Sequence, residues 1–291
     1  MIIGICVAAL LYDVVESIIT FLLARQYEPS FPFHKAVGNT FYCAFYRVAT
    51  LGSGAGVAAI YYLNENGIAP SKGFGMYMLE YAFHKISIAI FSGIFFLLNW
   101  SFMQQHFGEY DWMLVAGFGI TAVITTILVL FCTSKKFHDL LLKLLGLLNR
   151  KGKFQALHMQ LTEQCAMMEQ ASRDLLKNKL LIIETIVLNL IKLACWYGIP
   201  YFIFCSQSDI TVSQVLAITS LSVMLAAVIP SPAGIGSTEF VFTALFGTIV
   251  GTGLAGSASL LYRFGTFVFP FLVGAAIVIL RRIQARKGLK R

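Results

Sequence analysis

The stretch Pro230-Ser231-Pro232-Ala233-Gly234-Ile235-Gly236-Ser237 interrupts a long apolar part of the sequence. Prolines and glycines this dense do not continue a helix, because proline removes a backbone donor and glycine adds chain entropy. The apolar run that follows, 238–252, is shorter than the roughly 20 residues that a full membrane span needs. Together with the preceding run, 211–229, it predicts a re-entrant hairpin or a pair of broken helices.

The composition around this stretch is that of a membrane protein. The chain is 58% hydrophobic and 12% charged, with a mean hydropathy of +0.76. A soluble domain is about a quarter charged, so this composition indicates lipid as the surrounding medium. The remaining apolar runs are 1–24, 36–63, 74–100, 112–132, 180–205 and 256–280. The sequence therefore predicts an all-α, polytopic membrane protein with a single transmembrane domain over 1–291.

A related break lies early in the chain, at Gly52-Ser53-Gly54-Ala55-Gly56 within the run 36–63. Aligned with Pro230–Gly234, it matches in three of five positions. The loop charges suggest that the early segment enters from the inner side and the later one from the outer side. Paired interrupted segments of opposite sense indicate an inverted repeat with a binding site between them. The alternative is that the small residues only permit close helix packing.

The formal charge of +8 is concentrated in two places, the segment 133–179 and the tail 281–291. Basic residues beside apolar runs mark cytoplasmic loops, so we expect both segments, and hence the C-terminus, to be cytoplasmic. The first is predicted to be an amphipathic loop at the inner surface, with a solvated helix over 154–177. Attraction to anionic lipid explains this charge, and nucleic acid is not an expected partner. Counting membrane crossings back from these cytoplasmic segments places residue 1 on the outer side. This placement predicts a further helix upstream.

Charged residues beside the two breaks are the first candidates for a lipid site, because ionisable groups inside a membrane are costly. Arg47 precedes the first break, Glu239 follows the second, and Arg263 lies in the final run. Arginines and the free backbone N–H groups of half-helices both suit an anionic headgroup. The predicted lipid-binding residues are Arg47, Ser53, Gly54, Gly56, Pro230, Ser231, Pro232, Gly234, Gly236, Glu239 and Arg263.

Other ionisable residues lie further from the breaks. Glu80 and His84 are spaced to share one helix face, and Lys85 adjoins them, so these three are additional candidates. Four more are expected to be paired or snorkelling structural groups. These are Asp13, Glu16, Glu184 and Lys192.

The sequence carries no motif of a familiar enzyme class: no GxSxG, HExxH, Walker loop or GxGxxG after a strand. Asp13 is the only aspartate in a clear span, so the paired aspartates of an intramembrane protease are not present. The six cysteines form no CxxC pair and are expected to be packing residues. We expect no catalytic residue, metal or cofactor.

Three short motifs resemble the lysylphosphatidylglycerol synthase transmembrane (flippase) family. The stretch Ala49–Gly56, with Ile60–Leu63 and Gly67, is similar to the first signature of that family. Pro230–Gly236 followed by Glu239 is similar to its Pro-x-Pro-Gly-Gly-x-Gly-x-x-Glu pattern, with Ala233 at the first of the adjacent glycines. Arg263, Pro270 and Gly274 resemble the closing span.

The resemblance implies a flippase-like protein of the cell membrane that binds and translocates an anionic or aminoacylated phospholipid. In full-length members a soluble C-terminal domain transfers lysine to phosphatidylglycerol. Because 281–291 is all that follows the last run, we expect that domain to be absent. The alternatives are a phosphatidylglycerol lysyltransferase, or its membrane subunit, in resistance to cationic peptides, and a non-transporting scaffold. The expected partners are membrane phospholipid and either a separate synthase or a second copy of the chain.

Overall fold

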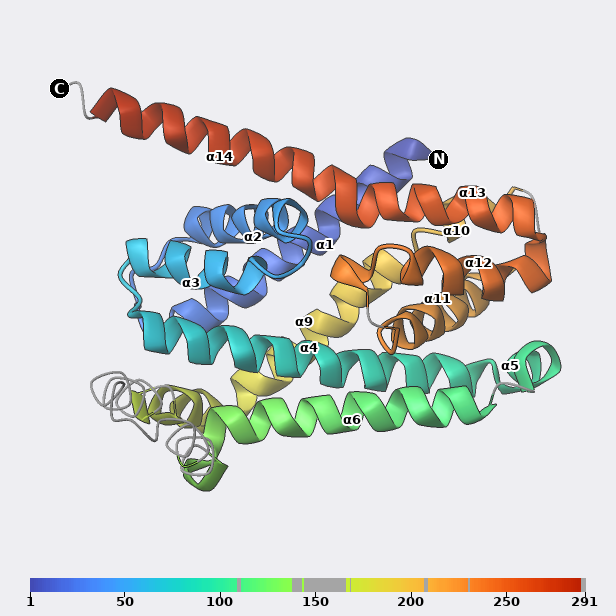
Figure 1. Ribbon diagram of the computed structural model, residues 1–291, viewed down its shortest axis with the longest axis horizontal. Helices are drawn as coiled ribbons and strands as arrows, with labels where there is room; N and C mark the ends of the chain where they lie inside the picture. Colours follow the sequence, from blue (N-terminus) through green and yellow to red (C-terminus); the bar gives the residue numbers. More distant parts are fainter. Residues whose placement is uncertain are drawn as a thin grey trace.

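Four long helices run between the two ends of the molecule in the computed structural model (Figure 1). They are α1 (Ile2–Ala24), α4 (Pro70–Leu98), α6 (Asp111–Thr133) and α9 (Lys179–Tyr197). Short helices α5 (Trp100–Phe107) and α10 (Tyr201–Phe204) follow α4 and α9. The structure describes residues 1–108, 111–137, 143, 166–167, 169–206, 209–229 and 231–288. Within these ranges it contains helices and no strand, which confirms the all-α prediction.

The C-terminal part of the chain forms one more long helical rod. It consists of α13 (Thr252–Arg263), a π-helical turn, η3 (Phe264–Val268), and α14 (Phe269–Gly288). A π-turn inserts an extra residue into the helix, and here it lies just before Pro270, where a helix loses a backbone donor. Among the described residues, six helices are long and apolar enough to cross a membrane.

The first predicted break is a hairpin between α2 (Phe33–Ala49) and α3 (Ala55–Glu65). At 1.5 Å per residue, the 11 residues of α3 extend only about 16 Å, roughly half of a hydrocarbon core. The turn between the helices has positive φ angles at Leu51 (51°) and Gly52 (96°). The Thr50 hydroxyl closes the turn by donating to the Tyr46 carbonyl and accepting from the Gly54 N–H.

The second predicted break is a hairpin between α11 (Val212–Ala226) and α12 (Ser237–Val250). One 3₁₀ turn, η2 (Pro232–Gly234), lies between them. Here the positive φ angles are at Ala233 (55°), Gly234 (69°) and Gly236 (86°). Pro230, which the sequence assigns to the same break, lies outside the described residues. The prediction of two broken segments is therefore confirmed.

The tips of the two hairpins meet inside the molecule. A Cβ atom added to Gly52 would lie 3.2 Å from the Ala233 backbone nitrogen, so the two tips approach through bare backbone. In Figure 1, α2 and α3 return to one end of the molecule, whereas α11 and α12 return to the other. This opposed entry is the geometry of an inverted repeat that the sequence predicts.

Both hairpins pack against α4, and each has further helices of its own around it. The first packs against α1, α4 and α14, and the second against α4, α6, α9 and α13. The contact between α14 and α2 is especially close, because a Cβ on Gly274 would lie 2.3 Å from the Phe41 carbonyl oxygen. Arg281 of α14 also pairs with Glu65 of α3 at 2.7 Å.

Part of the segment predicted as a solvated helix packs against the bundle. Residues 169–177 are helical, and Ala171 and Leu175 are buried. The Tyr27 hydroxyl donates to the Ala171 carbonyl at 2.8 Å, and the Arg173 guanidinium donates to the Thr133 carbonyl at the end of α6. The solvated-helix prediction is wrong here because these contacts hold the segment against the loop after α1. The predicted amphipathic stretch lies mostly outside the described residues.

Candidate functional site

A cavity of about 570 Å³ lies beneath the meeting hairpin tips. Helices α1, α2, α4 and α9 form most of its wall, and the two tips contribute Gly52, Ser231, Ala233 and Gly234. The ionisable side chains that line it are Asp13, Glu16, Cys43, Arg47, Glu80, His84, Lys85, Lys192 and the tyrosines Tyr12, Tyr77 and Tyr81. The structure thus brings predicted candidates from both breaks and from α4 to one site.

Arg47 is placed in this cavity by the last turn of α2, just before the first hairpin tip. Its guanidinium interacts electrostatically with Tyr12, Tyr77 and Glu16. Among the described residues it has no hydrogen bond and no ion pair within 4.0 Å. A guanidinium carries five N–H donors in a planar fork, so an unpaired one in a cavity is ready to bind an oxyanion.

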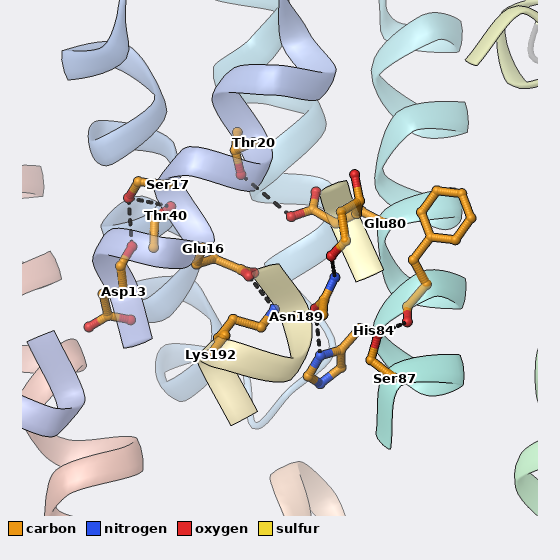
Figure 2. A network of polar contacts seen from close by, with 12 residues as sticks. Asp13, Glu16, Ser17, Thr20, Thr40, Glu80, His84, Ser87, Asn189 and Lys192 are labelled. Atoms are coloured by element: carbon orange, nitrogen blue, oxygen red, sulfur yellow. Dashed lines mark hydrogen bonds and ion pairs between the residues drawn. The ribbon is translucent and has the colours of Figure 1, made fainter. Parts of the chain in front are cut away.

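Lys192 on α9 also lines the cavity and is already paired. It forms a salt bridge with Glu16 of α1 (Figure 2). Its Nζ atom also lies 5.3 Å from the centre of the Tyr12 ring. Tyr12 stacks on Trp196 with ring centroids 3.7 Å apart. The ion pair and the stacked rings together join α1 to α9. Lys192 therefore contributes to the contact between these helices and does not present an unpaired charge to the cavity.

The α4 wall carries Glu80 and His84 one turn apart, as the sequence spacing predicts. The Thr20 hydroxyl lies 3.5 Å from the Glu80 Oε1 atom, and His84 Nδ1 lies 3.2 Å from the Asn189 Oδ1 atom (Figure 2). An amide oxygen only accepts, so this contact requires the His84 Nδ1 atom to carry hydrogen. Nearby, the Lys85 Nζ atom lies 5.3 Å from the Tyr81 ring centre.

Asp13 on α1 lines the cavity with a carboxylate oxygen that has no partner. Only 3% of the residue is exposed, and its Oδ2 atom has no hydrogen-bond partner. The Ser17 hydroxyl is bonded to the backbone carbonyl of Asp13 at 2.7 Å and to the Thr40 hydroxyl at 3.1 Å (Figure 2). The polar network therefore passes beside the Asp13 carboxylate without stabilising it.

Arg263 and Glu239, both predicted as lipid-binding, lie outside the cavity lining and bind each other. The Arg263 Nε atom is 2.7 Å from Glu239 Oε1, and its Nη2 atom donates to the Ala233 carbonyl at 3.3 Å. Glu239 Oε2 accepts from the Gly236 N–H at 2.8 Å. These bonds hold the tip of the second hairpin. Arg263 and Glu239 therefore support the turn that borders the cavity and do not line the cavity themselves.

The other predicted residues support the tips or lie apart from the cavity. Ser53 and Gly54 are tied to Thr50 within the first turn, and a Cβ on Gly56 would lie 2.8 Å from the Tyr77 ring. Pro232 and Gly236 shape the second turn without lining the cavity. Ser231 lines the cavity and shares a 2.6 Å hydrogen bond with Ser237.

Sequence reasoning did not assign Asp13, Glu16 and Lys192 to this site. Each was noted as an ionisable group within an apolar run, which was the available signal. Their common location depends on α1 packing against α9, and the pair Glu16–Lys192 joins residues 176 positions apart. The pattern of residues within a single apolar run does not reveal a contact between two residues so far apart in the sequence.

The cavity presents charges of both signs. Three carboxylates, on Asp13, Glu16 and Glu80, face three cations, on Arg47, Lys85 and Lys192. Only Glu16 and Lys192 form an ion pair with each other. Among the described residues, no group of three or more His, Cys, Asp or Glu side chains is arranged to hold a metal ion. The arrangement can bind a polar, charged group through hydrogen bonds and ion pairs.

Comparison with known proteins gives a family and no individual relative. No curated protein and no solved structure matches the chain. The family model described as the lysylphosphatidylglycerol synthase TM region matches residues 1–274 of the 291. This match covers α1 to α12, α13 and the first part of α14, and therefore includes both hairpins and the cavity. The chain is a multi-pass membrane protein that belongs to the lysylphosphatidylglycerol synthase transmembrane family.

Proposed function

We propose that the protein binds the headgroup of an anionic or aminoacylated phospholipid in this cavity and moves the lipid between leaflets. The observation that carries the proposal is Arg47, an unpaired guanidinium in a cavity roofed by two hairpin tips. A guanidinium binds phosphate oxygens through parallel N–H donors, and such charge-assisted bonds are about twice as strong as neutral ones. Membrane interiors do not keep an unpaired arginine without a compensating role.

The size and lining of the cavity support a lipid headgroup. About 570 Å³ lies within the usual range for small-molecule sites, roughly 300–1,000 Å³. Two lining residues, Tyr81 and Ile229, are 40% and 41% exposed, so apolar surface adjoins the polar interior. Such a boundary suits a molecule with a charged headgroup and acyl chains.

The arrangement of the hairpins supports transport rather than binding alone. They enter from opposite ends and meet over the cavity, so each tip separates the site from one side. In transporters built from inverted repeats, the site lies between broken helices and access alternates by moving one repeat against the other. The near-contact of Gly52 and Ala233 supplies such a dividing point.

Reconstituted protein can test this function directly. Proteoliposomes would contain phosphatidylglycerol with a fluorescent acyl chain, and a membrane-impermeant quencher would report the fraction of label in the outer leaflet. We expect the wild-type protein to exchange the label between leaflets and Arg47→Gln to slow the exchange at least tenfold, since a charge-assisted bond contributes about 1.5–3 kcal/mol.

The matched control is Arg25→Gln, which alters an arginine that binds the Pro29 carbonyl at the surface. This variant should exchange lipid at the wild-type rate. Exchange no faster than in protein-free vesicles, with folded wild-type protein, would reject the proposed function. Equal slowing in both variants would remove Arg47 from it.

A further inference from the structure

We propose that Asp13 is a proton-binding site, and that phospholipid binding in the cavity is coupled to uptake of a proton on its carboxylate. The inference rests on the proposed function, because it describes what binding of the lipid phosphate does to a neighbouring group. It adds a second ligand, the proton, to a site whose first ligand is the headgroup.

The geometry of Asp13 is the first argument. Only 3% of the residue is exposed, and its Oδ2 atom has no hydrogen-bond partner. Among the described residues no cation lies within ion-pair distance of its carboxylate. An unpaired ionised carboxylate away from water costs several kcal/mol, whereas the neutral acid costs far less. A membrane interior makes this difference larger, since no solvent compensates it.

The charged groups that act on Asp13 lie on α1, α2 and α9. Arg47 on α2 and Lys192 on α9 favour its ionised form, and Glu16 on its own helix opposes it. Tyr12 lies on the same helix and is neutral. Lys192 is neutralised by its salt bridge to Glu16, so the field of Arg47 is the main influence that a ligand can change.

Binding of a phosphate to Arg47 changes that field. The phosphate carries one negative charge and cancels the positive potential of the guanidinium at Asp13. The Asp13 carboxylate then takes a proton from the buffered bulk solvent, forming the neutral acid, and releases it to the solvent when the phosphate leaves. Coupling between two sites is reciprocal, so protonation of Asp13 also strengthens phosphate binding. Each bound lipid phosphate, with its one negative charge, is then accompanied by one bound proton.

Glu80 does not offer the same coupling. It is 9% exposed, and the Thr20 hydroxyl lies beside its Oε1 atom, so one oxygen already has a polar partner. The charges that act on it are Glu16 and Lys192, which are paired with each other, and Arg47 is not among them. Its protonation therefore responds less to a ligand on Arg47.

Proton uptake can be measured in detergent-solubilised protein with short-chain dihexanoyl phosphatidylglycerol as the probe. Titration calorimetry in two buffers of different ionisation enthalpy gives the number of protons taken up for each lipid bound. For the wild type we expect uptake that rises toward one proton in the pH range where free Asp13 is ionised and lipid-bound Asp13 is protonated. Within that range the affinity should fall by up to about tenfold per pH unit, the slope of a single linked proton.

The variant Asp13→Asn imitates the protonated acid. We expect it to bind the probe with wild-type affinity at low pH, to take up no proton, and to lose the pH dependence. Glu184→Gln, which removes an exposed carboxylate of α9 outside the cavity, should behave as the wild type. Replacing the sodium of the buffer by choline at constant pH tests whether a metal cation is the coupled ion, and it should leave binding unchanged.

Infrared difference spectra of the wild type give a second readout that does not depend on a variant folding. Lipid binding should produce a carboxylic acid band that shifts with ¹³C-labelled aspartate and not with ¹³C-labelled glutamate. Binding without proton uptake at any pH, or uptake that persists in Asp13→Asn, overturns the coupling and leaves the proposed function intact. Absence of probe binding to folded protein rejects the proposed function, and the coupling with it.

Discussion

The two hairpins have the same plan but use their charged residues differently. In the first, Arg47 lies in the last turn of α2 and lines the cavity without an ion pair among the described residues. In the second, Glu239 lies in the first turn of α12 and is held by Arg263 of the neighbouring helix α13. Arg263 also binds the Ala233 carbonyl, so the second tip is fixed from outside by side-chain bonds.

The turns of the two hairpins also differ in which residues hold them. The first turn is closed by its own Thr50, and the second depends on bonds from α12 and α13. A group with satisfied partners contributes to stability, whereas a buried charge without a partner reduces it and remains available to a ligand. We infer that the second hairpin is the fixed half of the site and that the first carries the ligand-binding charge.

The largest expected effect is on lipid binding, at the first hairpin. Arg47→Gln should weaken the affinity for dihexanoyl phosphatidylglycerol about 10- to 100-fold, because it removes a charge-assisted bond worth about 1.5–3 kcal/mol. Since Arg47 has no partner to lose, the thermal unfolding midpoint in detergent should stay the same or rise. Calorimetry and a melting curve on one sample give both numbers. A lower unfolding midpoint together with an unchanged lipid affinity would show that Arg47 stabilises the fold and does not bind the lipid.

The opposite pattern is expected at the second hairpin. Arg263→Gln leaves Glu239 unpaired, and the free energy of unfolding should fall by about 2 kcal/mol, below the fully buried value because both side chains are partly exposed. Denaturant or thermal unfolding measures this change. Arg281→Gln breaks the more exposed pair with Glu65 and should cost less than about 1 kcal/mol. If the double variant Arg263→Gln/Glu239→Gln is no more stable than Arg263→Gln, the pair is not the cause.

Glycines at the two tips separate backbone strain from contact between the tips. Gly52 and Gly236 both have positive φ angles, so alanine at either position should cost about 1 kcal/mol. Only Gly52 also meets the other tip, so Gly52→Ala should cost about 1 kcal/mol more and slow lipid exchange. Unfolding of both variants in parallel gives the difference. Equal costs would show that the tips are not in contact in solution.

The smallest expected effect is a gain. Ala233 has a left-handed backbone, which costs a non-glycine residue about 1–2 kcal/mol. Ala233→Gly should therefore stabilise the protein by about 0.5 kcal/mol, after the added entropy of the unfolded chain is subtracted. Leu51→Gly tests the non-glycine residue with a left-handed backbone in the first hairpin, where φ is 51°. Destabilisation in both variants would contradict the strain assigned to these turns.

The sequence predicts the hairpins better than it predicts the site. Proline and glycine at 230–237 and glycine at 52–56 act through local backbone geometry, so their effect is visible along the chain. The long spans are equally visible in the sequence, because each is a long and mostly apolar stretch. The role proposed for Asp13 could not be predicted from the sequence, since it depends on side chains that two other helices, α2 and α9, bring near it. Likewise, the sequence places Arg263 in the final run as a candidate residue, but its bond to Ala233 requires the folded turn.

The rod formed by α13, η3 and α14 has a mechanical consequence for both hairpins. Its first part holds the second hairpin through Arg263, and its last part holds the first through Gly274 and Arg281. The π-turn and Pro270 lie between these two attachments. While both attachments persist, any displacement of one hairpin relative to the other bends this helix, and the bend is easiest where its hydrogen bonding is already irregular. Residues 264–270 would then act as the hinge of the whole molecule.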